Sequence, residues 1–422
     1  MVTKLVIFGI TGDLSRRKLL PALRQIITSG SFDDLQIIGV SRRDVDLNTL
    51  LANLEELKPR TSIHTMDLAE VSDYVDLKNA INLKDDEQLL VYLAVPPSAA
   101  TQIVDFMGEA GVNTPNVKIL FEKPFGVDLL SAQEFIERTA RYFDESQLYR
   151  IDHYLAKEMA QNIVTFRGGN ALFGNIWNNN FIQSIEIVAS ESIDIEGRGQ
   201  FYEQTGALRD VVQGHLMQLL ALTLMDIPDD FDWNQLPDLR LRALEQLHQV
   251  DPQKACRAQY EGYQEEAENL GSQTETFVSI ELRSDQPRWL DVPIRLITGK
   301  ALAEKTTEVR IHLKKIHEAQ SNTVVFRIQP NEGIDIELFA KRPGYERTFE
   351  SRHLELTFPE DTTFPDAYEQ VLVDAIRSEK SLFTSSQEVI RSWEILAPLQ
   401  QAWDMDNTPL PVYSKGTNPQ SN

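Results

Sequence analysis

Two histidines lie in sequence surroundings suited to proton transfer or phosphate binding. His153 stands in the string Arg150-Ile151-Asp152-His153-Tyr154-Leu155-Ala156-Lys157-Glu158. On a helix, His153 and Lys157 would share a face, where an imidazole and an ammonium could bind one phosphate, while Asp152 would point about 100° away. A salt-bridged helix without a ligand would explain the same residues.

The second histidine, His215, lies in the mainly apolar segment Arg209–Leu220. A neutral imidazole can act as a general base near neutral pH, but a lone histidine on an apolar helix is more often a buried structural residue. Asp210 lies five positions earlier, which is about 140° around an ideal α-helix. The two side chains therefore converge only if the helix begins irregularly, and the spacing leaves both readings open.

A glycine turn near the N-terminus is a candidate phosphate-binding loop. The residues Gly9-Ile10-Thr11-Gly12-Asp13-Leu14 follow an apolar run and begin a helical pattern. In this context a dinucleotide phosphate can bind backbone N–H groups at the helix N-terminus. The spacing is G-x-x-G rather than G-x-G-x-x-G, so a plain tight turn is the alternative.

The residues after the second expected strand bear on which dinucleotide binds. A site that prefers NAD usually has an acidic residue there, which binds the ribose 2′-hydroxyl, whereas this chain has Ser41-Arg42-Arg43. Paired arginines bind a 2′-phosphate, so the sequence favours NADP and leaves NAD as the alternative. A solvated basic turn would explain the arginines without a ligand.

The first third of the chain alternates strand-like and helix-like segments. Apolar runs at Leu5–Phe8, Leu35–Gly39, Leu89–Val95 and Val117–Phe121 are typical of buried parallel strands. The pattern predicts an α/β Rossmann-type domain over residues 1–149.

Beyond about residue 180 the apolar residues alternate with polar ones, as at Val278, Ile280 and Leu282. This period predicts a large, mainly antiparallel sheet, hence an α+β domain over residues 150–422. Helices are expected near 208–224, 366–377 and 387–403. The tail from about Asp406 is rich in Asn, Pro, Ser and Gly, and we expect it to be disordered or to lie on the surface.

Composition limits the possible partners. The 422 residues include 41 basic and 64 acidic side chains, a formal net charge of −23. Such a charge argues against nucleic acid or an anionic membrane as the main partner, so an anionic ligand requires a local basic cluster. A single cysteine, Cys256, excludes an intramolecular disulfide and a cysteine-based metal cluster. With no signal-peptide pattern and no apolar stretch of membrane-spanning length, a cytoplasmic protein is expected.

Several collinear motifs over nearly the whole chain resemble those of the glucose-6-phosphate dehydrogenase family. The most specific is the Arg150–Glu158 string. The others are Gly9-x-x-Gly12-Asp13-Leu14, Glu122-Lys123-Pro124-Phe125-Gly126, Glu196-Gly197-Arg198-Gly199, Arg209-Asp210-Val211, Gly299-Lys300-Ala301-Leu302, Gln329-Pro330-Asn331-Glu332 and Pro365-Asp366-Ala367-Tyr368-Glu369, with a looser match around Trp393.

The resemblance implies a role for each matching residue. It implies that His215 is the general base and that Asp152 orients and stabilises it. Lys123 matches a residue shared by substrate and coenzyme, and Arg42 matches the 2′-phosphate contact. The remaining matches imply a sugar-phosphate site at His153, Tyr154, Lys157, Lys300 and Lys305, and contacts to sugar hydroxyls at Glu191, Asp210 and Gln329. No metal is required, because the coenzyme accepts the electrons.

The implied reaction is oxidation of glucose 6-phosphate at C1 by NADP, in a homodimer formed through the sheet of the second domain. The chain departs from the family in a shorter segment between about Asp229 and Thr274, in Ala156 in place of glycine, and in Ser15 in place of alanine. Two rivals remain open at this point: a sugar dehydrogenase with a different substrate, and a catalytically silent regulatory homologue.

Overall fold

The computed structural model describes residues 2–32, 34–315, 321–359 and 361–419. Contacts divide the chain into two compact units. Unit 1 consists of Met1–Ala156, Trp233–Pro237 and Pro365–Val389. Unit 2 consists of Lys157–Asp232, Asp238–Phe364 and Ile390–Asn422. The units are therefore not two consecutive blocks of sequence, because the chain returns to unit 1 near its end.

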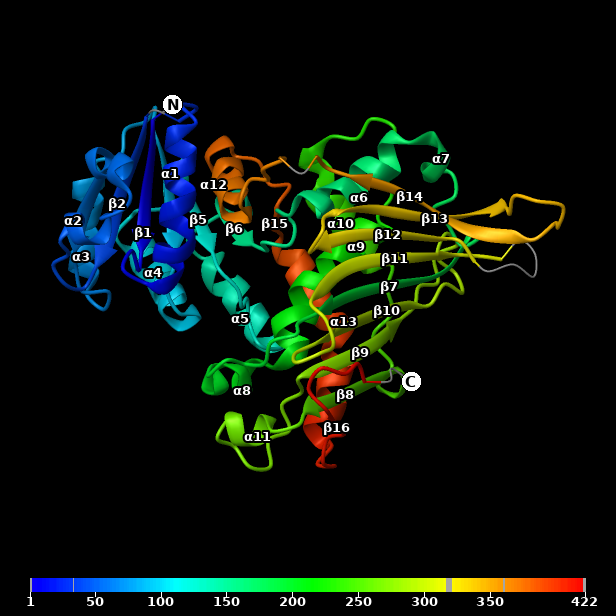
Figure 1. Cartoon of the computed structure of the whole chain (residues 1–422). Helices are drawn as coiled ribbons and strands as arrows, with labels where there is room; N and C mark the ends of the chain where they lie inside the picture. Colours follow the sequence, from blue (N-terminus) through cyan, green and yellow to red (C-terminus); the bar gives the residue numbers. More distant parts are fainter. Residues whose placement is uncertain (1, 33, 316–320, 360, 420–422) are drawn as a thin grey trace. The chain divides into compact units, whose positions relative to one another are not determined.

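Unit 1 is built on a seven-stranded sheet with the order β15-β6-β5-β4-β1-β2-β3 (Figure 1). Six strands are parallel, and β15 runs antiparallel to β6. The strands are β1 (Thr3–Phe8), β2 (Leu35–Ser41), β3 (Thr61–Thr65), β4 (Gln88–Leu93), β5 (Val117–Phe121), β6 (Leu148–Ile151) and β15 (Phe383–Thr384). The four expected strands and the parallel sheet are confirmed.

The central strands are mainly apolar because both faces of the sheet are covered. Every residue of β1, β4 and β5 is buried, as expected for parallel strands between layers of helices. Around them lie η1 (Ser15–Leu19), α1 (Leu20–Thr28), α2 (Leu47–Leu50), η2 (Glu55–Arg60), α3 (Val71–Ile81), α4 (Pro97–Glu109), α5 (Leu129–Thr139), η3 (Glu145–Gln147), η5 (Trp233–Gln235) and α12 (Ala367–Arg377).

Two lysines, the buried Lys118 and the partly buried Lys380, attach the returning segment to the sheet of unit 1. The Lys118 ammonium on β5 donates to the Ala375 carbonyl oxygen at 2.6 Å. The Lys380 ammonium donates to the Leu148 carbonyl oxygen at 2.6 Å and lies 3.8 Å from the centre of the Tyr149 ring. Burial lowers the pKa of Lys118 to about 8 and that of Lys380 to about 7.

These lowered pKa values predict that the free energy of unfolding rises with pH above 7. Between about pH 7 and 10 the unfolded chain holds a proton on Lys380 that the folded chain has released, so higher pH favours folding. One full proton corresponds to a slope of about 1.4 kcal/mol per pH unit. We expect Lys380→Met to flatten the slope by up to that amount in urea titrations at several pH values. Lys341→Met, at an exposed position, is the control; equal slopes for Lys380→Met and the native chain would contradict the prediction.

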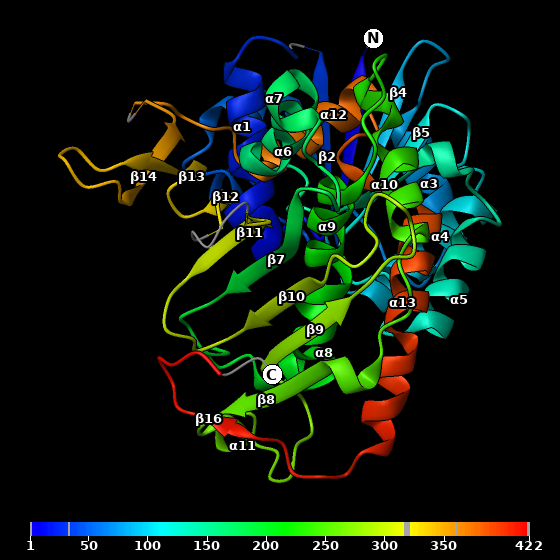
Figure 2. The same ribbon diagram turned by 90° about the vertical axis from the view of Figure 1, so that its right-hand side faces the viewer.

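Unit 2 is built on a nine-stranded sheet with the order β14-β13-β12-β11-β7-β10-β9-β8-β16 (Figures 1 and 2). Neighbouring strands are antiparallel except for β7 with β10 and β8 with β16, which confirms the mainly antiparallel sheet. The strands are β7 (Ile182–Ser190), β8 (Ala255–Tyr260), β9 (Phe277–Leu282), β10 (Ile294–Gly299), β11 (Thr306–Leu313), β12 (Thr323–Gln329), β13 (Gly333–Lys341), β14 (Phe349–Thr357) and β16 (Val412–Tyr413).

The helices of unit 2 include a rare π-helical segment. They are α6 (Glu158–Gly169), α7 (Ala171–Gly174), α8 (Gly199–Ala207), the π-helix η4 (Leu208–Leu216), α9 (Met217–Leu224), η6 (Pro252–Lys254) and α11 (Tyr263–Glu266). Two further helices, α10 (Leu236–Glu245) and α13 (Ser386–Met405), begin in residues of unit 1 and continue in unit 2. The three helices expected in this half of the sequence are confirmed, the first as η4 followed by α9.

In the part that the structure describes, the tail from Asp406 lies along the surface with most of its residues exposed, which is the second of the two alternatives expected for it. Val412 and Tyr413 form β16, which pairs with β8, and Tyr413 is buried. The physical reason is that this aromatic ring joins the apolar cluster around Tyr260 and Phe277. A single buried anchor of this kind outweighs the polar composition of its neighbours.

Candidate active site

The first glycine of the N-terminal turn has a conformation and surroundings that only glycine fits. Gly9 has a φ of +82°, and a Cβ atom there would lie 2.4 Å from the Ala94 carbonyl oxygen. The Gly12 N–H donates to the Gly9 carbonyl oxygen at 2.9 Å and closes the turn. The Ser15 hydroxyl donates to the same carbonyl oxygen at 2.9 Å. The turn therefore follows β1 closely and leads into the next helical segment, which is the place where a dinucleotide phosphate binds in this kind of fold.

The remaining residues predicted to bind the coenzyme lie at the edge of the sheet where the glycine turn begins. Because β1 and β2 are parallel and Phe8 pairs with Val40, Ser41 ends β2 and Arg42 leaves the sheet at the edge where the glycine turn begins. The Ser41 hydroxyl accepts the Arg43 N–H at 3.2 Å, and Arg42 is exposed. Ile10 is buried, whereas Thr11 and Asp13 are exposed. An exposed guanidinium at this edge fits a 2′-phosphate, which is dianionic and partly hydrated.

Two further strands of unit 1 end in charged residues at this edge. Lys123 follows β5 and Asp152 follows β6, and β5 and β6 are parallel. Glu122 lies between the end of β5 and Lys123, and its carboxylate accepts a hydrogen bond from the Tyr92 hydroxyl. Burial, followed by the nearby charge of Asp152, raises the pKa of Glu122 to about 7. Sequence reasoning assigned no role to Glu122; its place after a buried strand was the available signal.

The expectation that His153 and Lys157 share a helix face is wrong. Residues 153–156 form turns, and α6 begins at Glu158. The Asp152 carboxylate accepts the Tyr154 N–H at 3.0 Å, and the Asp152 carbonyl oxygen accepts the Leu155 N–H at 3.0 Å. This local bonding by an aspartate competes with a helical start and holds the chain in a turn. It also fixes Asp152, which is 1% exposed.

Four predicted residues of unit 2 gather at one edge of the nine-stranded sheet because of strand direction. Parallel strands β7 and β10 end together, with Ser190 paired to Gly299, so Glu191 and Lys300 emerge side by side. Strand β11 starts at the same edge, after Lys305, and β12 ends there at Gln329. None of the four lies within ten residues of another except Lys300 and Lys305, so only the sheet brings the set together.

Specific bonds link the residues of this edge. The Lys300 ammonium, which is almost fully buried, forms an ion pair with the Glu191 carboxylate and lies 5.3 Å from the centre of the Tyr202 ring. The Lys157 ammonium, at the residue before α6, donates to the Gln329 side-chain oxygen at 2.6 Å. Lys305 is exposed. The edge therefore combines ammonium groups with a carboxylate and an amide, the groups that bind a phosphorylated sugar.

The π-helix settles the question of the angle between Asp210 and His215. In a π-helix each N–H donates to the carbonyl oxygen five residues earlier. Residues five positions apart are therefore separated by about one turn and lie on the same side of the helix. Asp210 and His215 both lie within η4, and His215 is 7% exposed. Helix η4 packs against β7 and β10, the strands that lead to Glu191 and Lys300. The irregular helix that the spacing required is present.

The start of η4 is held by a buried acidic residue. The Glu275 carboxylate accepts the Leu208 N–H at 2.8 Å, and the Glu275 carbonyl oxygen accepts the Ala207 N–H at 3.0 Å. Burial raises the pKa of Glu275. Gly206 has φ +66° and ψ 171°, a conformation that is open essentially to glycine alone, and a Cβ atom there would lie 2.5 Å from the Glu275 carboxylate.

We therefore expect Gly206→Ala to lower the free energy of unfolding by about 1–3 kcal/mol. The substitution forces a strained backbone and a steric clash with Glu275 at the start of η4. Thermal or urea unfolding measures the loss. Gly169→Ala is the matched control, since no atom lies within 4 Å of its Cβ position and its φ is not in the left-handed region. Equal stability of the two variants would contradict this account.

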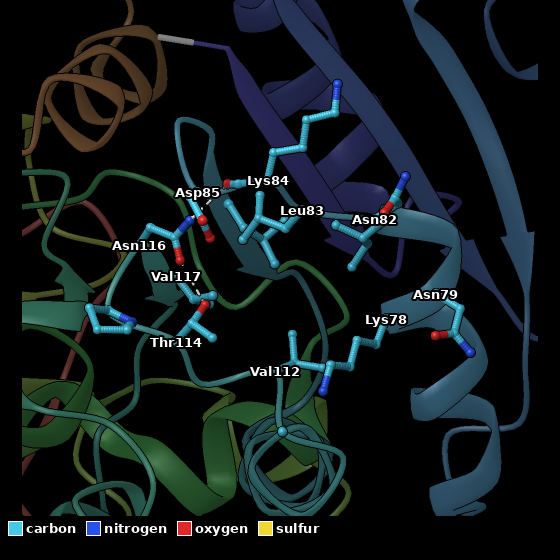
Figure 3. Close-up of a pocket in the computed structure, with 14 residues that line it drawn as sticks. Lys78, Asn79, Asn82, Leu83, Lys84, Asp85, Val112, Thr114, Asn116 and Val117 are labelled. Atoms are coloured by element: carbon cyan, nitrogen blue, oxygen red, sulfur yellow. Dashed lines mark hydrogen bonds between the residues drawn. The ribbon is translucent and has the colours of Figure 1, made fainter.

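A pocket of about 580 Å³ in unit 1 contains none of the predicted site residues. It lies between the end of α3 and the segments that lead into β4 and β5, at the amino-terminal edge of those strands. Figure 3 shows Lys78 and Asn79 on one side of it and Thr114, Asn116 and Val117 on the other. Because the glycine turn follows the carboxyl end of β1, which is parallel to β4, this pocket lies at the opposite edge from the coenzyme residues.

The geometry of the two units defines a class of protein. A parallel sheet with a glycine turn after its first strand and arginines after its second is the architecture that binds a dinucleotide. Unit 2 adds a histidine on a π-helix beside a basic sheet edge. Together these features define a two-domain, dinucleotide-dependent oxidoreductase with a site for an anionic substrate.

The particular family follows from comparison with known proteins. Residues 6–162 match the family model described as "Glucose-6-phosphate dehydrogenase, NAD binding domain", and residues 164–422 match the model of its C-terminal domain. The chain belongs to the glucose-6-phosphate dehydrogenase family. Among the described residues, no helix is both long and apolar enough to cross a membrane.

Relatives match over nearly the whole chain. The glucose-6-phosphate 1-dehydrogenase of Chlamydia muridarum is 34% identical over 98% of this chain and 92% of its own. That of Dickeya dadantii is 33% identical over 98% of this chain and 94% of its own. A solved glucose-6-phosphate dehydrogenase in complex with its substrate glucose 6-phosphate has a TM-score of 0.93 at 32% identity, covering 99% of this chain and 95% of its own. The Mycobacterium avium enzyme has a TM-score of 0.87 at 32% identity, with 99% and 94% covered.

Proposed function

We propose that this protein oxidises glucose 6-phosphate at C1 with NADP and produces 6-phosphoglucono-1,5-lactone, the first step of the oxidative pentose phosphate pathway. The observation that carries the proposal is the set of Lys157, Glu191, Lys300 and Gln329 at one edge of the sheet in unit 2. Family membership over nearly the full chain supports it.

His215 is the proposed general base. Oxidation of the hemiacetal requires removal of the O1 proton while hydride leaves C1, and a neutral imidazole suits that transfer near pH 7. Asp152 is proposed to fix the tautomer of the imidazole and to stabilise the imidazolium that forms. The position of Asp152 within its own turn, held by the Tyr154 N–H, supplies the rigidity that such a partner needs.

The other site residues are proposed to bind the substrate. Ammonium groups and an imidazole bind the 6-phosphate, and carboxylates and amides accept or donate hydrogen bonds to sugar hydroxyls. The residues proposed to bind the 6-phosphate are His153, Tyr154, Lys157, Lys300 and Lys305. Those proposed to bind the sugar hydroxyls are Glu191, Asp210 and Gln329. Lys123 is proposed to contact both the substrate and the coenzyme. Because the protein carries a net charge of −23, a dianionic substrate needs this local cluster of positive charge in order to bind.

The coenzyme fits the residues present in unit 1. Glycine at position 9 permits the left-handed conformation of the turn and its close approach to Ala94, and Arg42 suits the 2′-phosphate of NADP, with NAD as a weaker alternative. The nicotinamide ring, when bound, supplies the hydride acceptor. The residues Gly9–Leu14, Ser41 and Arg42 bind and orient the coenzyme.

The location, oligomeric state and partners of the enzyme are also part of the proposal. A cytoplasmic homodimer is proposed, formed through the sheet of unit 2, with neither nucleic acid nor membrane as a partner. The strongly negative charge supports the absence of a nucleic acid partner. Sedimentation velocity measures the oligomeric state.

A coupled assay tests the function directly. The purified chain is incubated with glucose 6-phosphate and either NADP or NAD, and formation of the reduced coenzyme is followed. We expect rapid NADPH formation and a lower kcat/KM with NAD. A folded protein that is inactive with both coenzymes would overturn the proposal. Activity with glucose but not with its phosphate would point to a different sugar dehydrogenase.

A further inference from the structure

The C-terminal segment is an ordered part of unit 2 whose contacts reach a predicted substrate residue. Strand β16 adds to the edge of the nine-stranded sheet, where Tyr413 pairs with Tyr260. The Gln259 N–H donates to the Pro411 carbonyl oxygen at 2.9 Å, and the Glu261 N–H donates to the Tyr413 carbonyl oxygen at 2.8 Å. Backbone pairing therefore fixes the segment, and its side chains make further contacts.

The Tyr413 hydroxyl bonds the backbone of the Lys300 loop. It donates to the Lys300 carbonyl oxygen at 2.6 Å and lies 3.0 Å from the Thr276 hydroxyl oxygen. Tyr413 is 7% exposed, so these bonds are made away from water, where an unpaired carbonyl oxygen is costly. The Lys300 N–H in turn donates to the Thr276 carbonyl oxygen at 2.9 Å.

Two more bonds from the segment hold the residues that follow Lys300. The Gly416 N–H donates to the Ala301 carbonyl oxygen at 2.8 Å, and the Ala303 N–H donates to the Asn418 side-chain oxygen at 3.3 Å. Ala301 has a φ of +52°, a conformation that is unfavourable for a residue with a Cβ atom. A strained residue persists only where its surroundings hold it.

We infer that Val412–Asn418 is a strap and that its Tyr413 is a positioning residue, which sets the backbone of Lys300 and thereby aims its ammonium at the substrate phosphate. The inference rests on the proposed role of Lys300 in substrate binding. The strap and the Glu191 segment bind the loop jointly, since the Leu302 N–H donates to the Glu191 carbonyl oxygen at 2.9 Å. The Lys300–Glu191 ion pair and the backbone of the Lys300 loop are therefore held together.

Tyr413→Phe tests the strap, because it removes one hydroxyl and keeps the ring in its apolar cluster. We expect KM for glucose 6-phosphate to rise about 3- to 10-fold, the range that one lost hydrogen bond gives. We expect kcat and KM for NADP to stay within about twofold. Tyr345→Phe is the matched control, because Tyr345 is fully exposed on the segment between β13 and β14.

Hydrogen exchange gives a second readout that needs no activity. In Tyr413→Phe we expect the amides of Ala301, Leu302 and Ala303 to exchange faster, while the amides of β1 and β4 are unchanged. An unchanged KM together with unchanged exchange would overturn the inference, as would an equal loss of kcat and thermal stability. A native chain inactive on glucose 6-phosphate would overturn the proposed function instead, and exchange would still test the strap.

Discussion

Replacing His215 by alanine is expected to lower kcat by at least about 100-fold, with KM for glucose 6-phosphate changed little. The effect follows from loss of the group proposed to accept the O1 proton, since a positioned general base contributes about 10²–10⁴-fold to the rate. Loss of a residue that acts in the transition state lowers kcat and kcat/KM together. Steady-state assays of NADPH formation measure both constants.

The alternative reading of His215 as a buried structural residue makes a different prediction. In that case thermal stability and kcat would fall together, because His215 is only 7% exposed and its removal would leave a cavity. Unfolding curves recorded beside the kinetics separate the two. His248→Ala is the control: this histidine pairs with Asp285 at the surface, with 51% of its side chain exposed, and its loss should leave kcat unchanged.

Replacing Lys157 by alanine is expected to raise KM for glucose 6-phosphate by about 10- to 100-fold. A hydrogen bond from a charged group contributes about 1.5–3 kcal/mol, which corresponds to this range. The Lys157 ammonium already has a fixed direction, because it donates to the Gln329 side-chain oxygen at 2.6 Å. The kinetic constants with glucose 6-phosphate and with unphosphorylated glucose give the measurement.

The two substrates distinguish phosphate recognition from general damage. If Lys157 binds the phosphate, the substitution changes KM for glucose 6-phosphate and leaves the much weaker reaction with glucose as it was. Lys157→Arg retains a positive charge and should lie between the native chain and the alanine variant. Equal increases in KM for both sugars would instead favour a sugar dehydrogenase that does not recognise phosphate.

Local sequence patterns predicted four of the seven strands of unit 1. Parallel strands that are buried on both faces are mainly apolar, and every residue of β1, β4 and β5 is buried, although Lys4, Gln88 and Lys118 are polar. The residue after each strand then lies at the carboxyl edge whatever the rest of the fold does. For this reason Gly9, Arg42 and Lys123 could be placed at the same edge from sequence alone.

Sequence reasoning was wrong, or left alternatives open, where a local preference competed with a helix or where a distant partner took part. The turn at residues 153–156 depends on hydrogen bonds to Asp152, which helical spacing does not encode. The π-helix η4 depends on Glu275, which bonds the Leu208 N–H from 67 residues away. The tail is anchored by Tyr413, whose ring packs in an apolar cluster with Tyr260 of β8 and Phe277 of β9, and β8 and β9 are paired strands.

By itself, therefore, the sequence determined the periodicity of the strands, the glycine turn, the residue types of the site and the resemblance to a family. The tertiary structure alone decided that Lys157 meets Gln329 across 172 positions, that Pro365–Val389 returns to unit 1, and that the tail holds the Lys300 loop. The physical reason is that apolar periodicity and turn preference act over a few residues, whereas the pairing of distant strand ends depends on the order and direction of every strand between them.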